Sequence, residues 1–400
     1  MKILIIMPWY SIWIFKGNSR RILNLIRILK RAGVEIFVLE VIPYTLFRKS
    51  LLLVQDIDVN EVNPNVHIYV MNNRLQSRGR INNYIIRAIL TLRLLLKSLR
   101  YRRILNSVDL IHVPDSRIEF VGLAYVISRI LNRKLVITFQ LVPRYLKEIA
   151  IDKDIGLFRS AIRHYLYVKN EGILLSLVKS LVLWLYVNII KRSFAIVLNK
   201  HDYDILSKKY GVSTFISWNG ISKPNVRHLN YDKYRIVYIG RDERKGLKDI
   251  MSVIPLIINE DTKANFVLIG PELDLPNTIS YGFVSERVKW SLLCSSGLFV
   301  SPTYHDSFSL VIAEALSCGL PVITYDLPEL RAIYGGCKSV FFVKKGDINA
   351  LRDAIIRLLD VDENEYVKLR EEAMMCSNRF NWIDVTRREL EIYRDILRST

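Results

Sequence analysis

Cysteine is scarce in this sequence of 400 residues, and no segment of low complexity interrupts it. The four cysteines lie 24, 19 and 39 positions apart, with no Cys-x-x-Cys pair and no histidine cluster beside them. That spacing argues against a zinc site. We therefore expect four reduced thiols, as in an ordinary cytosolic protein. These cysteines are Cys294, Cys318, Cys337 and Cys376.

Acidic residues are also scarce, but only in the first half of the chain. Residues 1–212 contain 34 Lys and Arg against 14 Asp and Glu, which gives +20. Residues 213–400 contain 24 against 25, which gives −1, so the first half accounts for the formal net charge of +19. Such asymmetry indicates that one domain faces a polyanion or an anionic membrane, while the other has a different partner.

Charged residues make up only 24% of the chain and apolar residues 50%. This composition excludes a disordered protein and supplies two large cores, as the length also suggests. The N-terminus is apolar, but Pro8 interrupts it and no small-residue cleavage site follows. We therefore predict a buried first strand there rather than a secretory signal.

Short β-branched runs alternate with longer amphipathic segments, which is typical of parallel strands covered by helices. A helix is expected over 20–31, between the first two strands. Two successive series of this kind predict an α/β protein with two doubly wound sheets, whose ligands bind at the carboxyl ends of the strands. The predicted strands are Ile3–Met7, Glu35–Leu39, Leu110–Val113, Leu135–Phe139, Ala195–Leu198, Arg235–Ile239, Asn265–Ile269, Leu298–Val300, Pro321–Thr324 and Val340–Val343.

Two segments of the first half suggest a membrane surface. No acidic residue occurs over 62–108, and a helix predicted over 85–103 combines a leucine face with a cationic stripe. This pattern favours a helix lying on anionic lipid over simple solvation, and we find no nucleic-acid-binding module. The run Ile173–Ile190 is long enough to span a bilayer, but Lys179 near its middle favours a buried or interfacial helix.

The densest motif covers residues 301–321. A predicted strand ends before it, and Ser307 to Leu310 should open a helix whose first N–H groups have no partner inside the helix. Such a helix end attracts anions and suits a diphosphate. Asp306 and Glu314 are eight positions apart, about two helical turns, so both carboxylates can reach one ligand. A carboxylate beside a phosphate site is suited to sugar or ribose hydroxyls.

A second motif follows the predicted strand 235–239. Gly240 lets the backbone turn sharply and a ligand approach, and Arg241 and Lys245 follow. Their side chains would stabilise a departing diphosphate.

With these motifs the chain resembles the retaining glycosyltransferases of GT-B fold, of the glycogen-synthase-like and lipopolysaccharide-mannosyltransferase-like kind (glycosyltransferase family 4, group 1). The family signature is a glutamate, seven residues, and a second glutamate that opens Glu-Ala-x-x-x-Gly-x-Pro. Asp306, Glu314, Ala315, Gly319 and Pro321 hold these positions. The resemblance covers nearly the whole chain.

The resemblance implies a division of the chain into three parts. Residues 1–216 would form a Rossmann-like acceptor domain that faces the membrane, and 217–376 a Rossmann-like domain that binds the nucleotide-sugar donor across a central cleft. Residues 377–400 would form a helix that crosses back to the first domain.

The resemblance also implies roles for individual residues. Glu314 would bind the ribose and Asp306 the hydroxyls of the donor sugar, while Arg241 and Lys245 would neutralise the leaving nucleoside diphosphate. Arg20 and Gln140 would contact the acceptor. The remaining donor contacts would come from Gly17, Gly240, Phe283, Val284, Ser307, Phe308, Ser309 and Leu310. Members of the family need no metal and no cofactor; the co-substrate is a UDP-, GDP- or ADP-linked sugar.

Three positions depart from the family pattern. Asp306 replaces the first glutamate, Asn18 replaces a glycine of the first loop, and Gln140 stands where a histidine often ends a strand. Glutamine can hydrogen-bond a sugar but cannot titrate. Four Asp-x-Asp sequences, such as Asp360 to Asp362, are interpreted as helix caps or solvated loops, so no metal site is predicted.

The sequence thus predicts a retaining hexosyltransferase with a lipid-linked or growing glycan acceptor, in the biosynthesis of a polysaccharide or glycolipid. It would be cytoplasmic and peripheral on the inner face of the cell membrane, with no nucleic-acid partner. A sugar-nucleotide 2-epimerase and a non-catalytic relative that binds sugar nucleotide or membrane remain as alternatives. Turnover of donor without acceptor would indicate the first, and absence of any donor turnover the second.

Overall fold

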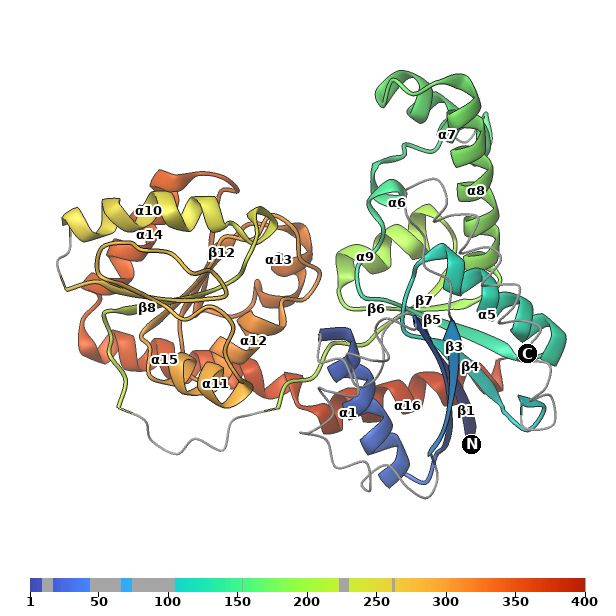
Figure 1. Ribbon diagram of the computed structural model, residues 1–400, viewed down its shortest axis with the longest axis horizontal. Helices are drawn as coiled ribbons and strands as arrows, with labels where there is room; N and C mark the ends of the chain where they lie inside the picture. Colours follow the sequence, from blue (N-terminus) through green and yellow to red (C-terminus); the bar gives the residue numbers. More distant parts are fainter. Residues whose placement is uncertain are drawn as a thin grey trace. The chain divides into compact units, whose positions relative to one another are not determined.

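The computed structural model describes residues 1–8, 17–43, 66–73, 105–152, 154–222, 230–260 and 263–399. It forms two compact units, Met1–Ser217 with Thr386–Thr400, and Trp218–Val385 (Figure 1). The last helix, α16 (Trp382–Arg398), begins in the second unit and ends in the first. The division between the two compact units therefore falls within this helix, after Val385.

The first unit contains a parallel sheet of seven strands in the order β3-β2-β1-β4-β5-β6-β7. All five strands predicted for this half are present, so the alternation of apolar runs is confirmed as a parallel-sheet pattern. Two strands, β3 and β7, were not predicted, and β7 ends at Ile216, directly before the predicted domain boundary. The strands are β1 (Lys2–Pro8), β2 (Glu35–Pro43), β3 (Val66–Asn73), β4 (Leu110–Val113), β5 (Lys134–Phe139), β6 (Phe194–Val197) and β7 (Ser213–Ile216).

Helices cover this sheet and fill its crossovers. The predicted helix over 20–31 begins three residues earlier, and the apolar segment from residue 173 is helical throughout. The basic helix predicted over 85–103 lies outside the described residues. The described helices are α1 (Gly17–Arg31), α5 (Ile118–Leu131), α6 (Arg144–Glu148), α7 (Gly156–Arg163), η4 (His164–Val168), α8 (Ile173–Lys191), α9 (Lys200–Asp204) and η5 (Ile205–Lys209).

The second unit contains a parallel sheet of six strands in the order β10-β9-β8-β11-β12-β13. Again the five predicted strands are present, and only the three-residue strand β10 is additional. The strands are β8 (Arg235–Ile239), β9 (Asn265–Ile269), β10 (Thr278–Ser280), β11 (Leu298–Ser301), β12 (Val322–Tyr325) and β13 (Val340–Val343). The helices are η6 (Glu243–Lys245), α10 (Leu247–Glu260), α11 (Glu286–Cys294), α12 (Leu310–Ser317), α13 (Pro328–Tyr334), α14 (Ile348–Asp360), α15 (Glu363–Ser377) and η7 (Asn378–Phe380).

Each sheet reverses its direction of winding once. In the second unit the chain runs outward from β8 through β9 to β10, then returns to β11 on the other side of β8. The loops that leave the carboxyl ends of β8 and β11 are therefore neighbours at the switch point, where doubly wound sheets bind ligands. Both chemical motifs of the sequence lie in these two loops.

A buried polar network joins α1, β4, β5 and α16 in the first unit. Arg21 forms an ion pair with Glu389, and the Tyr393 hydroxyl donates to the second Glu389 oxygen at 2.9 Å. Since that hydroxyl has one proton, its oxygen accepts from Nδ1–H of His112 at 3.0 Å. Nε2 of His112 then accepts from the Thr138 hydroxyl at 2.8 Å. Burial, with Arg21 nearby, lowers the pKa of His112 to about 3, so this histidine is neutral.

The prediction of free thiols is wrong in this structure. Cys294 is bonded to Cys318, and Cys337 to Cys376. Cys294 ends α11 and Cys318 follows α12, and folding brings their Cα atoms to 4.8 Å, within the usual range for a disulfide. The sequence separation of 24 positions concealed this proximity, because it contains a complete strand and helix.

Candidate functional site

The loop after β8 is shaped by a glycine at each end. A Cβ on Gly240 would overlap the Tyr238 hydroxyl and lie 2.8 Å from Cβ of Lys245. Gly246 has a positive φ of 77°, and a Cβ there would overlap the Pro302 carbonyl oxygen. The β8 loop is therefore packed directly against the chain that leaves β11. Only glycine fits these two positions. The close packing that they allow fixes the backbone position of Lys245 beside the loop after β11.

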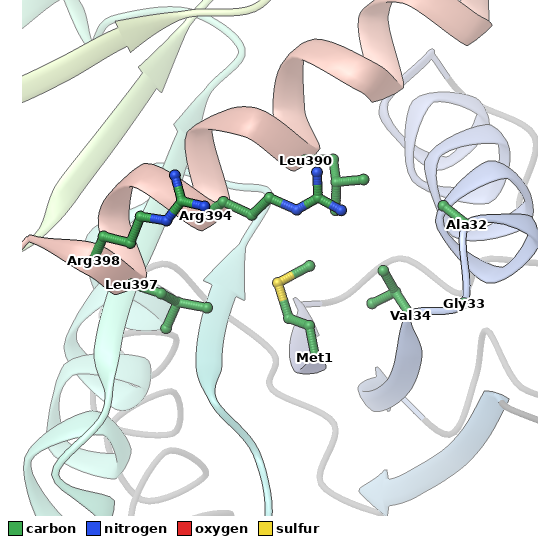
Figure 2. A pocket seen from close by; sticks show the side chains of 8 residues that line it. All are labelled: Met1, Ala32, Gly33, Val34, Leu390, Arg394, Leu397 and Arg398. Carbon is green, nitrogen blue, oxygen red and sulfur yellow. The ribbon is translucent and has the colours of Figure 1, made fainter.

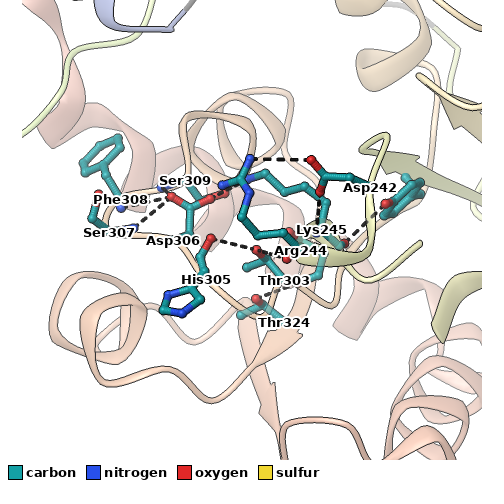
Figure 3. A network of polar contacts seen from close by, with 12 residues as sticks. Asp242, Arg244, Lys245, Thr303, His305, Asp306, Ser307, Phe308, Ser309 and Thr324 are labelled. Carbon is teal, nitrogen blue, oxygen red and sulfur yellow. Dashed lines mark hydrogen bonds and ion pairs between the residues drawn. The ribbon is translucent and has the colours of Figure 1, made fainter. Parts of the chain in front are cut away.

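Lys245 and Asp306, predicted from separate motifs, are in direct contact. The Nζ atom of Lys245 lies 2.6 Å from Oδ2 of Asp306 (Figure 3). Backbone contacts hold the two loops in register: Tyr304 N–H donates to the Arg244 carbonyl at 2.9 Å, and the Thr303 hydroxyl donates to the same oxygen at 3.3 Å. The side chains of Lys245 and Asp306 are 21% and 15% exposed, so a ligand can still reach them.

The N–H groups of Ser307, Phe308 and Ser309, which were predicted to be available to an anion, have a partner in the structure: the other carboxylate oxygen of Asp306. Oδ1 accepts hydrogen bonds from the backbone N–H groups of Ser307 at 2.9 Å, Phe308 at 3.4 Å and Ser309 at 2.9 Å. The helix α12 begins only at Leu310, after Ser309 with a φ of 54°. The carboxylate thus occupies the anion position that was predicted for a phosphate, because the loop folds around its own acidic side chain.

These contacts determine the charge of Asp306. Burial by itself would raise the pKa of this carboxyl group. The Lys245 ammonium and the N–H groups of Ser309 and Phe308 outweigh burial and lower the pKa below its usual value. Asp306 is therefore a carboxylate at neutral pH, able to accept hydrogen bonds from sugar hydroxyls.

The side chain of Phe308 serves a structural purpose. It is buried against Phe380 and Tyr334, with ring centroids 5.2 and 6.1 Å away. The Tyr334 hydroxyl also donates to the Phe308 carbonyl at 2.8 Å. Phe308, predicted to bind the donor, thus has a buried ring and bonded backbone groups, and it anchors the loop that carries Asp306.

Glu314 lies in the fifth position of α12 and is almost fully buried. Nζ of Lys289, on α11, lies 2.7 Å from Oε1 of Glu314 and 3.1 Å from Oε2 of Glu286. Lys289 was not among the residues predicted from the sequence. A signal was available, since Lys289 is one helical turn from the buried Leu293, and a lysine on the buried face of a helix needs an anion beside it.

Arg241 and Phe283 come together at the same edge of the sheet. The guanidinium carbon of Arg241 lies 4.5 Å from the centroid of the Phe283 ring, which is 80% exposed. Within the described parts of the chain, Arg241 has no carboxylate partner. Gly282 supports the turn before Phe283 with a φ of 58°, and Val284 follows it half-buried. A cation and an exposed aromatic ring are suited to a phosphate and a flat base.

The predicted acceptor residues Arg20 and Gln140, and the predicted donor contact Gly17, lie in the first unit. Gly17 opens α1 after β1, and Arg20 lies in its first turn; the Arg20 side chain is outside the described residues. Gln140 is the first residue after β5. Gln140 is thus at the carboxyl end of its strand, and residues 9–16, between β1 and α1, are outside the described residues. The acceptor role of Arg20 and Gln140 stays a prediction.

A cavity of about 280 Å³ in the first unit is a different kind of feature. Met1, Gly33, Val34 and Arg394 are among the residues that line it (Figure 2). Met1 and Val34 precede β1 and β2, so the cavity lies at the amino ends of the strands. Ligands of doubly wound sheets bind at the opposite edge, and we assign no function to this cavity.

Comparison with solved structures defines the class of protein. A sucrose-phosphate synthase from Thermosynechococcus elongatus superimposes over the full length of both chains, with a TM-score of 0.70 and 16% identity. WaaG, a glycosyltransferase involved in lipopolysaccharide biosynthesis, also matches over both full chains, with a TM-score of 0.63 and 13% identity. The chain has the GT-B fold, with two Rossmann-like domains, as predicted.

Sequence comparison gives the family. Residues 233–361 match the model of the glycosyl transferases group 1 family. The second unit, which holds the Lys245–Asp306 and Lys289–Glu314 pairs, is a group 1 glycosyltransferase domain, and this confirms the predicted family.

Curated relatives match a limited part of the chain. A phosphatidyl-myo-inositol mannosyltransferase of Mycobacterium leprae is 26% identical over 179 residues, which are 41% of this chain and 47% of the relative. A GDP-mannose:cellobiosyl-diphosphopolyprenol alpha-mannosyltransferase of Xanthomonas oryzae is 24% identical over 178 residues, 40% of this chain and 47% of the relative. The chain thus aligns with about half the length of these relatives.

Proposed function

We propose that the protein is a retaining glycosyltransferase that moves a hexose from a nucleotide sugar to a lipid-linked or growing glycan acceptor. The observation that carries the proposal is the meeting of Lys245 with Asp306 at the switch point of the second sheet. The site combines cationic side chains, which can bind a diphosphate, with carboxylates, which can accept hydrogen bonds from hydroxyl groups. A nucleotide sugar contains both a diphosphate and sugar hydroxyls. The resemblance to retaining enzymes supports the stereochemical part of the proposal.

The proposed mechanism assigns each side chain a task. Lys245 and Arg241 stabilise negative charge on the departing nucleoside diphosphate, and charge stabilisation of this kind is a major source of rate acceleration. Asp306 orients the donor sugar through its hydroxyls, and Glu314, held by Lys289, binds the ribose. The first unit binds the acceptor, and Arg20 and Gln140 contact it. The remaining contribution is positioning of the reactants.

The relatives suggest which acceptors to test. The two mannosyltransferases described above are named for lipid-type acceptors, a phosphatidyl-myo-inositol and a diphosphopolyprenol. A structural neighbour from Anabaena was solved with UDP and glucose at a TM-score of 0.64 and 14% identity. We therefore propose an acceptor at the cytoplasmic face of the cell membrane and a UDP- or GDP-linked donor.

The test is sugar transfer to membranes. Purified protein is incubated with membranes of the source cell and radiolabelled UDP-, GDP- or ADP-sugars, and the label in the lipid and glycan fractions is counted. The expected result is transfer from one donor, with the anomeric configuration of the donor retained in the product by NMR. Donor consumption without acceptor would instead identify an epimerase or a hydrolase, and complete absence of turnover would contradict an enzymatic role.

A further inference from the structure

The helix α8 buries two serines among apolar residues and exposes a row of leucine and valine side chains. Ser176 and Ser180 are fully buried, together with Leu183 and Val187 one and two turns further on. The opposite face is a stripe spaced by four, three and four residues, and it is exposed. This stripe consists of Leu174, Val178, Leu181 and Leu185, which are 77%, 51%, 48% and 47% exposed. A helix on the surface of a soluble protein normally has the reverse pattern.

The apolar surface continues beyond the helix. Tyr167 and Val168 in η4, which precedes α8 in the chain, are 81% and 67% exposed, and Ile173 at the start of α8 is 70% exposed. Figure 1 shows α7 and the first half of α8 extending away from the sheet of their own unit. We call Tyr167, Val168, Ile173 and the α8 stripe the α8 surface. Contiguous apolar patches of this size mark sites of interaction.

The charge around the α8 surface identifies its partner. Residues 144–192 contain nine Lys and Arg against four Asp and Glu, a net charge of +5. Lys191 and Arg192 lie at the end of α8, and Arg159 and Arg163 lie on α7, all four exposed. Two copies of this chain would bring these like charges together, whereas anionic headgroups would neutralise them. Apolar residues bordered by cations are typical of a helix that lies in the lipid interface.

We propose that the α8 surface inserts into the outer part of an anionic lipid leaflet. Among the described helices, α8 is the one with the length and hydropathy of a membrane span, but a third of its apolar window is buried inside the protein. The buried face is fixed to its own unit through Leu183, Tyr186 and Val187. The helix can therefore offer one side to lipid but cannot leave the domain to cross the bilayer, which makes the attachment peripheral.

This inference deepens the membrane part of the proposed function and rests on it. Insertion of α8 would hold the first unit at the depth where a lipid-linked acceptor presents its head group. It also differs from the prediction for the basic helix over 85–103, since electrostatic attraction alone is lost in high salt, whereas insertion of leucines persists.

The experiment compares the full-length protein with Leu174→Ser/Leu181→Ser in flotation with vesicles of phosphatidylglycerol and phosphatidylcholine. Both replaced side chains are exposed, so the fold should be retained. The expected result is at least a tenfold loss of vesicle binding, most evident at high salt. The matched control is Met375→Ser, 67% exposed on α15 of the second unit, which should bind as the wild type does.

Depth of insertion is measured with the native Trp184, 42% exposed on α8. Doxyl groups on the lipid chains should quench its fluorescence, and Trp184→Phe should abolish that part of the quenching. Equal vesicle binding of the double variant, or no quenching of Trp184, would overturn the proposal. So would a dimer in solution that the double variant dissociates without any binding to lipid.

The vesicles contain no sugar acceptor, so vesicle binding does not depend on sugar transfer. Binding of the donor nucleotide is measured in a separate experiment, as the shift in melting temperature caused by nucleoside diphosphates. Loss of vesicle binding with an intact thermal shift supports the α8 surface. A wild type that binds vesicles through Trp184 but no nucleotide would contradict the transferase function alone.

Discussion

One ion pair of the first unit and one of the second differ in exposure. Arg21 and Glu389 of the first unit are 1% and 0% exposed, and Ser217 and Tyr393 also donate to Glu389. Lys245 and Asp306 of the second unit remain 21% and 15% exposed. The first pair has its partners within the protein, whereas the second can exchange some of its contacts for a ligand. Exposure thus distinguishes a pair suited to stabilising the fold from the pair that we propose binds the donor.

The largest expected effect comes from breaking the first pair. Glu389→Ala leaves the Arg21 guanidinium buried without its carboxylate, which should lower the free energy of unfolding by about 3–5 kcal/mol. Urea denaturation followed by circular dichroism measures this loss. Glu391→Ala, on the same helix but half-exposed, is the control and should change the stability by less than about 0.5 kcal/mol. A small effect of Glu389→Ala would contradict the structural role of the pair.

Breaking the second pair should affect activity more than stability. Lys245→Ala removes the cation that we propose stabilises the leaving diphosphate, and it should lower the rate of sugar transfer by about 10²–10³-fold. Initial rates with a saturating donor measure the loss. Lys248→Ala, one turn away and exposed beside Glu243, should retain nearly full activity. Equal rates for wild type and Lys245→Ala would refute the assigned site.

The buried network of the first unit should make that unit sensitive to mild acid. The pKa of His112 is about 3 in the folded state and about 6.5 when unfolded, so the unfolded state binds more protons between these values. Stability is then complete above about pH 6.5 and falls as the pH decreases, by about 1 kcal/mol between pH 7 and 5.5. His112→Asn should flatten this part of the profile in chemical denaturation. An unchanged slope would show that His112 is already charged in the fold.

Lys289 offers the smallest and most specific test. Lys289→Met keeps the volume but removes the ammonium that holds Oε1 of Glu314, and we expect about 5- to 10-fold weaker donor binding with little change in kcat. Calorimetric titration with the donor measures the affinity. If kcat falls instead while the affinity stays constant, Glu314 does not act through ribose binding.

The same contrast shows what the sequence could predict. Ten strands and two doubly wound sheets could be predicted because apolar periodicity is a local property. The GT-B family and the candidate residues Asp306, Glu314, Arg241 and Lys245 could be proposed because these residues lie in recognisable motifs. The contact between Lys245 and Asp306 was not predicted, although the switch-point rule explains why the two loops are neighbours. Lys289 was missed because its partner lies on a different helix, 25 positions away.

Other errors have a similar physical cause. Cys294 and Cys318, joined by a disulfide, lie at the ends of separate helices. The Asp306 carboxylate accepts hydrogen bonds from N–H groups for which the sequence predicted no partner within the helix. Asp362 was correctly interpreted as a helix cap, since its carboxylate accepts from Glu365 N–H at 3.0 Å, three residues away. Local hydrogen bonds could be predicted, whereas long-range pairing required the fold.

The most direct test of the central claim is the thermal stability of the wild type and Lys245→Ala with UDP, GDP and ADP. A ligand that binds only the folded state raises its melting temperature. We predict that one of the three nucleotides raises the melting temperature of the wild type, and that the same nucleotide has a much smaller effect on Lys245→Ala. No shift with any nucleotide, or equal shifts in both proteins, would contradict a nucleotide-sugar site built on Lys245 and Asp306.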